Sequence, residues 1–404
     1  MARFAVISFH TSPLAQPGTG DGGGMNVYVR ELSASLARFG HEVDIYTRRD
    51  QAHQAATVVV EPGLRVHHVT AGPATSVDKG DLRLYVSDFT REVALLFRSH
   101  RPDIIHSHYW LSAIAGHELK HEFNVPHFVT FHTLERVKAE TFEMESDSRG
   151  HEEEQIVGCA DAVFASGDTE AQQIISHYGA DPTRVVTVPL GVDHAIFSPG
   201  DRGQARCASH LAVRGPLILF VGRLQRLKGV DLALEAFITL RQRGHDAHLA
   251  IIGGPSGPTG ADTLRLIHQR ITDENLVGDV SLVAPQSHVA LSTWYRAANV
   301  TVMPSRAESF GLVALESQAC GTPVVASRLG GLPLIVHDGE TGRLLESREP
   351  NEWADALWDV ITDVGDLPRN AAISSRAFTW STSARIVADL AVSVRARRLL
   401  DCWA

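Results

Sequence analysis

Residues 300–319 read VTVMPSRAESFGLVALESQA, an apolar run followed by a loop and a helical pattern. Val300–Met303 is typical of a short buried strand, and Leu312–Ala319 repeats its apolar residues at helical spacing. Similar pairs of apolar runs and helix-period segments recur along the whole chain. This alternation predicts parallel sheets with helices on both faces.

The strand-like runs form two series. The first comprises Phe4–Ser8, Val43–Tyr46, Val66–Val69, Ile104–His106, Phe128–Phe131, Val163–Ala165 and Val185–Val188. The second comprises Leu217–Val221, Leu249–Ile252, Val280–Val283, Val300–Met303 and Val324–Ala326. A chain of 404 residues exceeds the size of a typical single core, so we expect an α/β protein with two Rossmann-like domains.

The boundary between the predicted domains falls in Pro189–Gly200, which is punctuated by proline and glycine. We therefore assign residues 1–195 to an N-terminal domain and residues 196–379 to a C-terminal domain. A last helix over about 380–404 is expected to pack back on the N-terminal domain. Ligands bind outside the carboxyl ends of strands in such sheets, so two domains facing each other predict a deep cleft.

Composition and charge exclude some functions. The 37 basic and 47 acidic residues give a net charge of −10, which argues against a nucleic-acid partner. The N-terminus lacks a signal-peptide pattern and no apolar stretch is long enough to span a membrane, so we expect a cytoplasmic enzyme. The four cysteines (Cys159, Cys207, Cys320, Cys402) form no CxxC pair, and we expect reduced structural thiols. Assembly into a homodimer stays open.

The loop before the helix at 312–319 carries Glu308, and Glu316 follows inside the helix. The backbone N–H groups of Phe310, Gly311 and Leu312 would point outward at a helix N-terminus, which is an anion-binding geometry. N–H donors and carboxylates in one loop suit a ligand with both phosphate and hydroxyl groups. A nucleotide sugar is such a ligand.

Two further loops carry groups that suit phosphates. Residues 18–26, GTGDGGGMN, follow the first strand, and their glycines allow close approach of the backbone to a ligand. Their spacing matches neither the dinucleotide fingerprint nor the P-loop, and a flexible loop is the alternative. Arg223 and Lys228 could converge on a departing diphosphate, whose charge grows in the transition state, unless they form a solvated basic loop.

Histidines follow two strands of the first series. His106 and His108 form an HxH pair after one strand, but no third ligand stands at a useful spacing, so lining or packing is favoured over a metal site. His132 ends another strand and could act as a base, pack, or offer its carbonyl. We favour a position in a sugar pocket. Lys79 and Arg149, taken alone, are typical of ordinary surface charges.

Several motifs together resemble a known family. ESFGLVALE at 308–316, GRLQRLKG at 222–229 and the N-terminal glycine loop resemble the family-4 retaining glycosyltransferases, which have the GT-B fold. The resemblance covers nearly the whole chain. The segments 10–28, 70–73, 107–111 and 253–257 are similar to the branch that transfers N-acetylglucosamine from UDP-GlcNAc to 1L-myo-inositol 1-phosphate, the first step of mycothiol biosynthesis.

The resemblance implies an acceptor site in the N-terminal domain. Its residues would be His10, Asn26, Lys79, Tyr109, Thr133 and Arg149. The two cations and the two hydroxyls of this set would hold the acceptor phosphate, because an Arg fork, a Lys point charge and O–H donors match its oxygens. Asn26 would contact the inositol hydroxyls.

The resemblance also implies a donor site. Its residues would be Gly24, Arg223, Lys228, Glu308, Phe310, Gly311, Leu312 and Glu316. Gly24 would offer its backbone N–H to the donor phosphate, and the two cations would bind the diphosphate. Glu316 would take the ribose hydroxyls. Glu308 and the 310–312 backbone would hold the sugar, with His132 beside it.

The implied mechanism is retention, with attack on the same face as the departing UDP. The leaving phosphate oxygen would take the acceptor proton, and His132, Arg223, Lys228 and Glu308 would act by positioning and charge stabilisation. The sequence contains no Asp-x-Asp pair, which many metal-dependent sugar-nucleotide transferases use to hold Mg²⁺. We therefore expect that no cofactor is required and that Mg²⁺ at most stimulates the reaction.

Three departures from the family pattern keep alternatives open. Gln286 stands where relatives often carry an arginine beside the uracil site, and the segment around Arg149 diverges, as do the residues that follow Lys79. One alternative is a family-4 transferase with another nucleotide sugar or another phosphorylated acceptor, as in sucrose-phosphate synthesis. The other is a catalytically idle GT-B protein that binds a nucleotide sugar as a sensor or scaffold.

Overall fold

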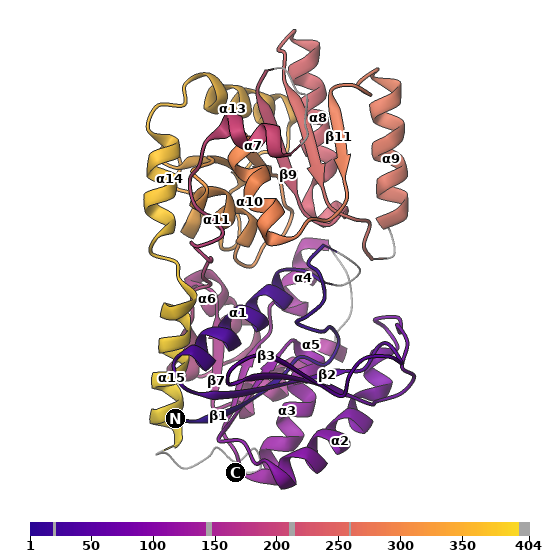
Figure 1. The fold of residues 1–404 in the computed structure, drawn as a ribbon, viewed down its shortest axis with the longest axis vertical. Helices are drawn as coiled ribbons and strands as arrows, with labels where there is room; N and C mark the ends of the chain where they lie inside the picture. Colours follow the sequence, from indigo (N-terminus) through magenta and orange to yellow (C-terminus); the bar gives the residue numbers. More distant parts are fainter. Residues whose placement is uncertain (19–21, 143–147, 210–214, 258–259, 396–404) are drawn as a thin grey trace. The chain divides into compact units, whose positions relative to one another are not determined.

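The computed structural model describes residues 1–18, 22–142, 148–209, 215–257 and 260–395, and divides the chain into two compact units (Figure 1). Unit 1 contains Met1–Ala15, Gly24–Gly191 and the chain from Trp380 onward. Unit 2 contains Gln16–Gly23 and Val192–Thr379. The glycine-rich segment 18–26 is therefore divided: its part up to Gly23 is assigned to unit 2, whereas Gly24–Asn26 begin α1 of unit 1.

Unit 1 is built on an eight-stranded sheet with the order β3-β4-β2-β1-β5-β6-β7-β8. All neighbouring strands are parallel except β3 and β4, which form an antiparallel edge pair. The strand order reverses between β1 and β5, and ligands bind outside the carboxyl ends of strands at such a switch point. The strands are β1 (Arg3–Ile7), β2 (Glu42–Arg48), β3 (Thr57–Glu61), β4 (Leu64–Val69), β5 (Ile104–His108), β6 (His127–Thr130), β7 (Ala162–Ala165) and β8 (Val185–Thr187).

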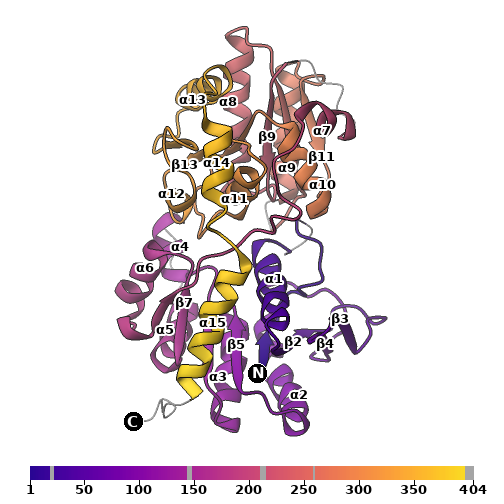
Figure 2. The ribbon, with the colours of Figure 1, turned by 60° about the vertical axis from the view of Figure 1, so that its left-hand side comes forward.

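Helices cover the sheet of unit 1 and bury its apolar residues. α2 and α5 pack against α3, and the apolar core beneath them includes Phe89, Phe97 and Ile105. α15 follows unit 2 in the chain yet packs beside α1 of unit 1 (Figure 2). The helices are α1 (Gly24–Arg38), α2 (Val86–Ser99), α3 (Trp110–Phe123), α4 (Glu135–Phe142), α5 (Ser148–Cys159), α6 (Asp168–Tyr178) and α15 (Trp380–Arg395), with 3₁₀ turns η1 (Leu82–Tyr85) and η2 (Pro182–Arg184).

Unit 2 is built on a six-stranded parallel sheet with the order β11-β10-β9-β12-β13-β14. Here the order reverses between β9 and β12. The strands are β9 (Leu217–Val221), β10 (His248–Ile252), β11 (Val280–Val283), β12 (Val300–Met303), β13 (Val324–Ser327) and β14 (Gly342–Leu345). The helices are α7 (Arg202–Ala208), α8 (Val230–Gln242), α9 (Gly260–Asp273), α10 (His288–Ala297), α11 (Leu312–Ala319), α12 (Leu332–Ile335), α13 (Pro350–Thr362) and α14 (Leu367–Ser375), with the 3₁₀ turn η3 (Arg226–Lys228).

The packing of the unit 2 core explains why its strands are short runs of consecutive apolar residues. Ile218 and Phe220 of β9 lie in one cluster with Phe237 of α8 and Trp353 of α13, all buried. Because both faces of a parallel sheet are covered, its strands are continuously apolar rather than alternating.

The prediction of an α/β protein with two parallel-sheet units is confirmed. β9, β11, β12 and α11 begin and end at the predicted residues. β3 and β14 were not predicted. The strand predicted over Ile104–His106 continues to His108, so the placement of His108 after that strand was wrong. Among the described residues, the structure contains no helix with the length and apolar character that crossing a bilayer would demand.

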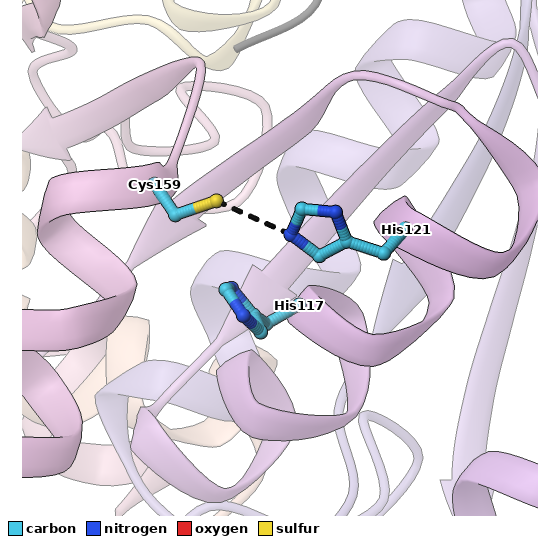
Figure 3. A group of neighbouring side chains, drawn as sticks. All are labelled: His117, His121 and Cys159. Atoms are coloured by element: carbon cyan, nitrogen blue, oxygen red, sulfur yellow. Dashed lines mark hydrogen bonds between the residues drawn. The ribbon is translucent and has the colours of Figure 1, made fainter. Parts of the chain in front are cut away.

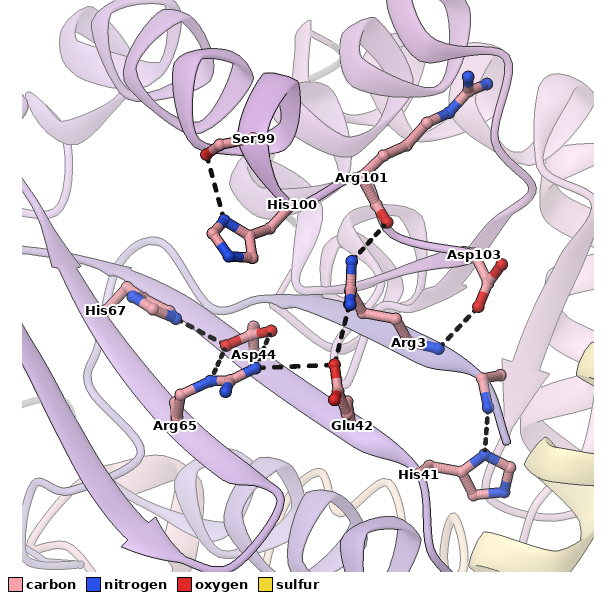
Figure 4. Close-up of polar contacts among 11 residues, drawn as sticks. Arg3, His41, Glu42, Asp44, Arg65, His67, Ser99, His100, Arg101 and Asp103 are labelled. Carbon is pink, nitrogen blue, oxygen red and sulfur yellow. Dashed lines mark hydrogen bonds and ion pairs between the residues drawn. The ribbon is translucent and has the colours of Figure 1, made fainter.

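Side chains of opposite charge pair near the amino ends of the unit 1 strands (Figure 4). Arg3 Nε lies 3.0 Å from Glu42 Oε2, and Arg65 Nε lies 2.6 Å from Asp44 Oδ1. His67 Nε2 approaches the same Asp44 oxygen at 2.7 Å. The charged side chains at the amino ends of these strands are therefore paired with one another.

Candidate functional site

The predicted acceptor residues lie at the opposite, carboxyl edge of the unit 1 sheet. His10 follows β1, Tyr109 follows β5, and Thr133 follows β6. Lys79 precedes η1, and Arg149 lies in the first turn of α5. Residues separated by up to 139 positions thus reach one edge because β1, β5 and β6 are neighbours in the sheet.

Tyr109 is the centre of this group. The Lys79 ammonium lies 5.0 Å from the Tyr109 ring centroid, and the Arg149 guanidinium carbon lies 4.9 Å from it. The His10 ring is 4.4 Å from the same ring. Tyr109 has a φ of 77°, which a non-glycine residue rarely adopts outside functional sites. The structure therefore gathers two cations around one buried phenol.

Arg149 is tied to its neighbours by several contacts. Its Nε donates to Glu153 at 2.7 Å, and its Nη1 lies 3.1 Å from a Glu135 carboxylate oxygen. Its Nη2 donates to the Thr133 carbonyl at 2.6 Å and lies 3.3 Å from the Thr133 hydroxyl. Arg149 and Thr133, both predicted for the phosphate, are therefore in direct contact.

Asn26 and Gly24 lie at the start of α1. The Asn26 amide donates to the Thr11 hydroxyl at 2.8 Å and to the Ser12 carbonyl at 2.6 Å. Asn26 is buried, so its amide holds the loop that follows His10. Gly24 is the first residue of α1 and is assigned to unit 1, whereas the other predicted donor residues are assigned to unit 2.

His132 lies beside the acceptor group but is a poor base. Its Nε2 is 3.1 Å from His108 Nδ1, and its ring meets the Tyr28 ring edge to face at 5.1 Å. Burial lowers the pKa of His132 to about 3, because the charged form loses its hydration. The imidazole is thus neutral at pH 7, which suits a hydrogen-bonding role rather than proton abstraction. Its φ of 62° is a second positive value at this edge.

The predicted donor cations lie at the carboxyl edge of the unit 2 sheet. Lys228 Nζ donates to Glu308 Oε2 at 2.7 Å, which joins the loop after β9 to the loop after β12. Arg223 lies near the glycine-rich loop, since a Cβ on Gly23 would lie 3.8 Å from its Nε. Within the described residues, the Arg223 guanidinium has neither an ion pair nor a hydrogen bond. Residues 19–21 of that loop lie outside the described residues.

Glu316 lies below this surface in α11. Its side chain is buried and accepts a hydrogen bond from the Tyr295 hydroxyl at 2.9 Å. Burial raises the pKa of Glu316 to about 7, although the Tyr295 hydrogen bond lowers it in part. With a pKa of about 7, Glu316 therefore changes its charge near neutral pH.

The loop that carries Glu308 is shaped by glycine. Gly311 caps α11 with a φ of 104°, between the buried Phe310 and the half-buried Leu312. Gly330 has a φ of 54°, and a Cβ there would lie 1.7 Å from the Glu308 carbonyl oxygen. Only glycine allows the 330–331 backbone to support the loop this closely.

Sequence reasoning missed two residues of these groups. Tyr295 was not predicted, because its role depends on the contact between α10 and α11. Lys138 was also missed; it lies on α4, and burial together with the positive charges of Arg149 and Lys79 lowers its pKa to about 8. A single lysine in an amphipathic helix gives no local signal, since most such lysines are solvated. Gln286, predicted near the base, donates to the Ala284 carbonyl at 2.8 Å.

One group of metal-ligand type lies apart from these residues, at His117, His121 and Cys159 (Figure 3). Their ligand atoms lie within 4.8 Å of one another, between α3 and the end of α5. However, Cys159 is disulfide-bonded, so its sulfur is not a thiolate ligand. The expectation of reduced cysteines is therefore wrong for Cys159, whereas Cys207 and Cys320 are free.

Comparison with known proteins places the chain in a family. Residues 23–191 match the family described as glycosyl transferase 4-like domain, and residues 202–378 match glycosyl transferases group 1. A D-inositol 3-phosphate glycosyltransferase of Mycolicibacterium gilvum is 44% identical over 94% of this chain and 86% of that protein. D-inositol 3-phosphate glycosyltransferase 2 of Catenulispora acidiphila is 42% identical over 96% of this chain and 94% of that protein.

Among solved structures, the chain is similar to sucrose-phosphate synthase from Thermosynechococcus elongatus. The TM-score is 0.90 at 30% identity, over 98% of this chain and 100% of that one. The two parallel-sheet units therefore correspond to the GT-B fold. The chain belongs to the glycosyltransferase family that contains the D-inositol 3-phosphate glycosyltransferases.

Proposed function

We propose that this glycosyltransferase moves N-acetylglucosamine from UDP-GlcNAc to 1L-myo-inositol 1-phosphate, as the first step of mycothiol biosynthesis. The observation that carries the proposal is the pair of cations, Lys79 and Arg149, held against Tyr109 and beside Thr133. Two cations with two hydroxyls match a phosphate monoester. The names of the relatives at 42 and 44% identity agree with a phosphorylated inositol as acceptor.

The donor end of the proposal rests on unit 2. Arg223 and Lys228 would neutralise the diphosphate, and Lys228 would exchange its Glu308 contact for a phosphate oxygen. This frees the Glu308 carboxylate to accept hydrogen bonds from the sugar. Glu316 would accept the ribose hydroxyls, which its ionised form does better than its neutral form.

The proposed step is transfer with retention on the face that UDP leaves. The bond from C1 of the sugar to the diphosphate oxygen breaks, a bond from C1 to an inositol oxygen forms, and the inositol proton passes to the departing phosphate. His132 would position the sugar, because a neutral imidazole with a pKa near 3 is too weak a base to take that proton. Charge stabilisation by Arg223 and Lys228 supplies the remaining catalysis.

The test of the proposal is acceptor-dependent release of UDP. The purified chain is incubated with UDP-GlcNAc alone, with inositol 1-phosphate and with inositol, and the sugar product is identified by mass spectrometry. Release that needs inositol 1-phosphate supports the proposal. Release that is the same with and without acceptor would overturn it.

Lys79→Ala tests the phosphate contact. We expect the affinity for inositol 1-phosphate to fall about tenfold or more, because a charge-assisted hydrogen bond is lost. The affinity for inositol should stay within about twofold. Isothermal titration measures both, and an equal loss for both ligands would remove Lys79 from the phosphate site.

A second candidate acceptor is a sugar phosphate, favoured by the similarity to a sucrose-phosphate synthase. The cluster around Tyr109 would bind the phosphate of either ester. Fructose 6-phosphate therefore belongs in the same assay. UDP release with fructose 6-phosphate but not with inositol 1-phosphate would replace the first candidate.

A further inference from the structure

Two histidines of α3 and a cysteine of α5 form a group of metal-ligand type outside the candidate site (Figure 3). The motif HELKH, which begins at His117, has the H-E-x-x-H spacing that places two imidazoles on one face of a helix. The rings of His117 and His121 have centroids 4.8 Å apart, and Cys159 ends α5. The predicted acceptor residues Tyr109 and Arg149 lie at the amino ends of these two helices, so acceptor binding does not account for the group.

The geometry of the group fits one zinc ion. Zinc binds imidazole nitrogens at about 2.0–2.1 Å and thiolate sulfur at about 2.3 Å, in tetrahedral geometry. Two ligand atoms of one ion are then about 3.3–3.6 Å apart. His121 Nε2 and Cys159 Sγ are 3.4 Å apart, and the three ligand atoms all lie within 4.8 Å of one another. A small rotation of one ring would therefore complete three ligand positions and leave the fourth for water.

The surroundings of His117 also favour a metal ligand. Its Nδ1 is buried and has no hydrogen-bond partner among the described residues, and a bound water or ion is a common reason for such an atom. The ammonium of Lys120 on the same helix would repel a cation if it were unpaired. However, its Nζ lies 2.9 Å from Asp161 Oδ2 and both side chains are buried, so this pair carries no net charge.

The oxidation state of Cys159 decides whether the third ligand is available. In the structure Cys159 is disulfide-bonded, and a disulfide sulfur is not the thiolate that binds metals. A dithiol reductant splits this bond by thiol–disulfide exchange, in which two protein thiols form and the reductant becomes a cyclic disulfide. The Cys159 thiol then releases its proton to solvent when the sulfur binds the metal.

We propose that His117, His121 and Cys159 form a zinc site that exists only while Cys159 is reduced. The disulfide and the zinc ion are then alternative states of one sulfur. Imidazole and thiolate ligands favour zinc over magnesium and calcium, which bind oxygen. Because the ligands come from two helices, the ion would join α3 to α5. This inference does not depend on the proposed acceptor or donor.

Zinc binding by the reduced and the oxidised protein tests the inference. The chain is reduced with a dithiol, separated from it by gel filtration without oxygen, and titrated with zinc against a chromophoric chelator. We expect one zinc ion per reduced chain and at least ~100-fold weaker binding by the oxidised chain, because the loss of outer-shell partners alone costs about 10–100-fold. Cobalt in place of zinc should give the ultraviolet absorption of a cobalt–thiolate bond, which identifies the sulfur as a ligand.

Single substitutions test each ligand in turn. His117→Ala, His121→Ala and Cys159→Ser should each weaken zinc binding by the reduced chain at least ~100-fold. His121 is exposed, so His121→Ala should fold even if the two less exposed positions do not tolerate substitution. The matched controls are His268→Ala on α9 and Cys207→Ser on α7. These remove an exposed histidine and an exposed free cysteine and should leave zinc binding unchanged.

Thermal unfolding measures whether the ion joins the two helices. Zinc in large excess over its Kd should raise the melting temperature of the reduced protein by at least ~5 °C and should not change that of reduced His121→Ala. Zinc binding that is equally tight in the oxidised protein, or that survives His121→Ala, would overturn the inference. A reduced chain that binds no zinc would overturn it as well.

Discussion

Glu316 is a carboxyl group whose protonation links stability to pH. In the folded protein it keeps its proton up to about pH 7, whereas an unperturbed carboxyl releases it near 4.5. Its contribution to the unfolding free energy is therefore fully present below about pH 4.5 and is lost as pH rises to 7 and above. Glu316→Gln cannot ionise and should be more stable than the unmodified protein at pH 8, by about 1–3 kcal/mol.

Thermal unfolding of both proteins at pH 5 and pH 8 measures this difference. Glutamine can still accept from the Tyr295 hydroxyl, so the comparison isolates the charge. UDP affinity should fall in Glu316→Gln at pH 8, because the ionised carboxylate is the better acceptor for ribose hydroxyls. The same stability difference at both pH values would show that Glu316 does not titrate in this range.

At the scale of elements, the loop between β12 and α11 depends on Gly330. Alanine there would place a Cβ 1.7 Å from the Glu308 carbonyl oxygen and would also hold a φ of 54°. Gly330→Ala should therefore displace the loop, destabilise unit 2 and weaken UDP binding. Gly339→Ala is the matched control, because Gly339 has a φ of 77° but no atom within 4 Å of its Cβ position.

In the control Gly339→Ala, the free energy of unfolding should fall only by the cost of a left-handed backbone at a non-glycine residue, about 1–2 kcal/mol. We expect Gly330→Ala to exceed it by at least ~1 kcal/mol in urea unfolding, because the steric clash adds to the backbone cost. We also expect UDP affinity, measured by titration, to fall in Gly330→Ala alone. Equal effects of the two substitutions on both quantities would mean that the 330–331 backbone does not shape the Glu308 loop.

The sequence predicted strands best where they are buried on both faces, as in β12. It missed β3, whose apolar run is only three valines long and whose residues are all exposed or half-buried. It also missed β14, which begins at Gly342, where a Cβ would lie 2.0 Å from the Val324 carbonyl oxygen. Glycine is a weak strand former, so only the pairing with β13 makes this segment a strand.

The candidate site also combines features that the sequence predicts with contacts that only the fold creates. Sequence placed Lys228 and Glu308 at strand ends, and the fold confirms that placement, but their contact joins residues 80 positions apart. The contact forms because β9 and β12 are neighbours in the sheet, and no local sequence pattern predicts that these two strands pair. Likewise, the carboxylates that surround Arg149 come from α4 and α5, and only the packing of these helices brings them together.

At the scale of the whole molecule, the chain returns from unit 2 to complete unit 1. α15 buries Ala384, Val387, Ala391 and Val394 at helical spacing, and Trp380 at its start meets Tyr28 of α1 edge to face at 5.7 Å. Ser383 donates to the Pro189 carbonyl, near the end of the other chain segment of unit 1. A segment distant in sequence therefore forms part of the first core.

Val387 and Val392 provide a matched pair for measuring what α15 contributes, because one is fully buried and the other is 70% exposed on the same helix. Val387→Ala should lower the unfolding free energy by about 2 kcal/mol, through lost burial and the cavity left behind. Val392→Ala should stay within about 0.5 kcal/mol. Hydrogen exchange locates the effect: Val387→Ala should accelerate exchange in α1 and α15 and leave β9 and β12 of unit 2 unchanged. Acceleration in β9 and β12 to the same extent would mean that α15 stabilises both units, and that the two unfold as one.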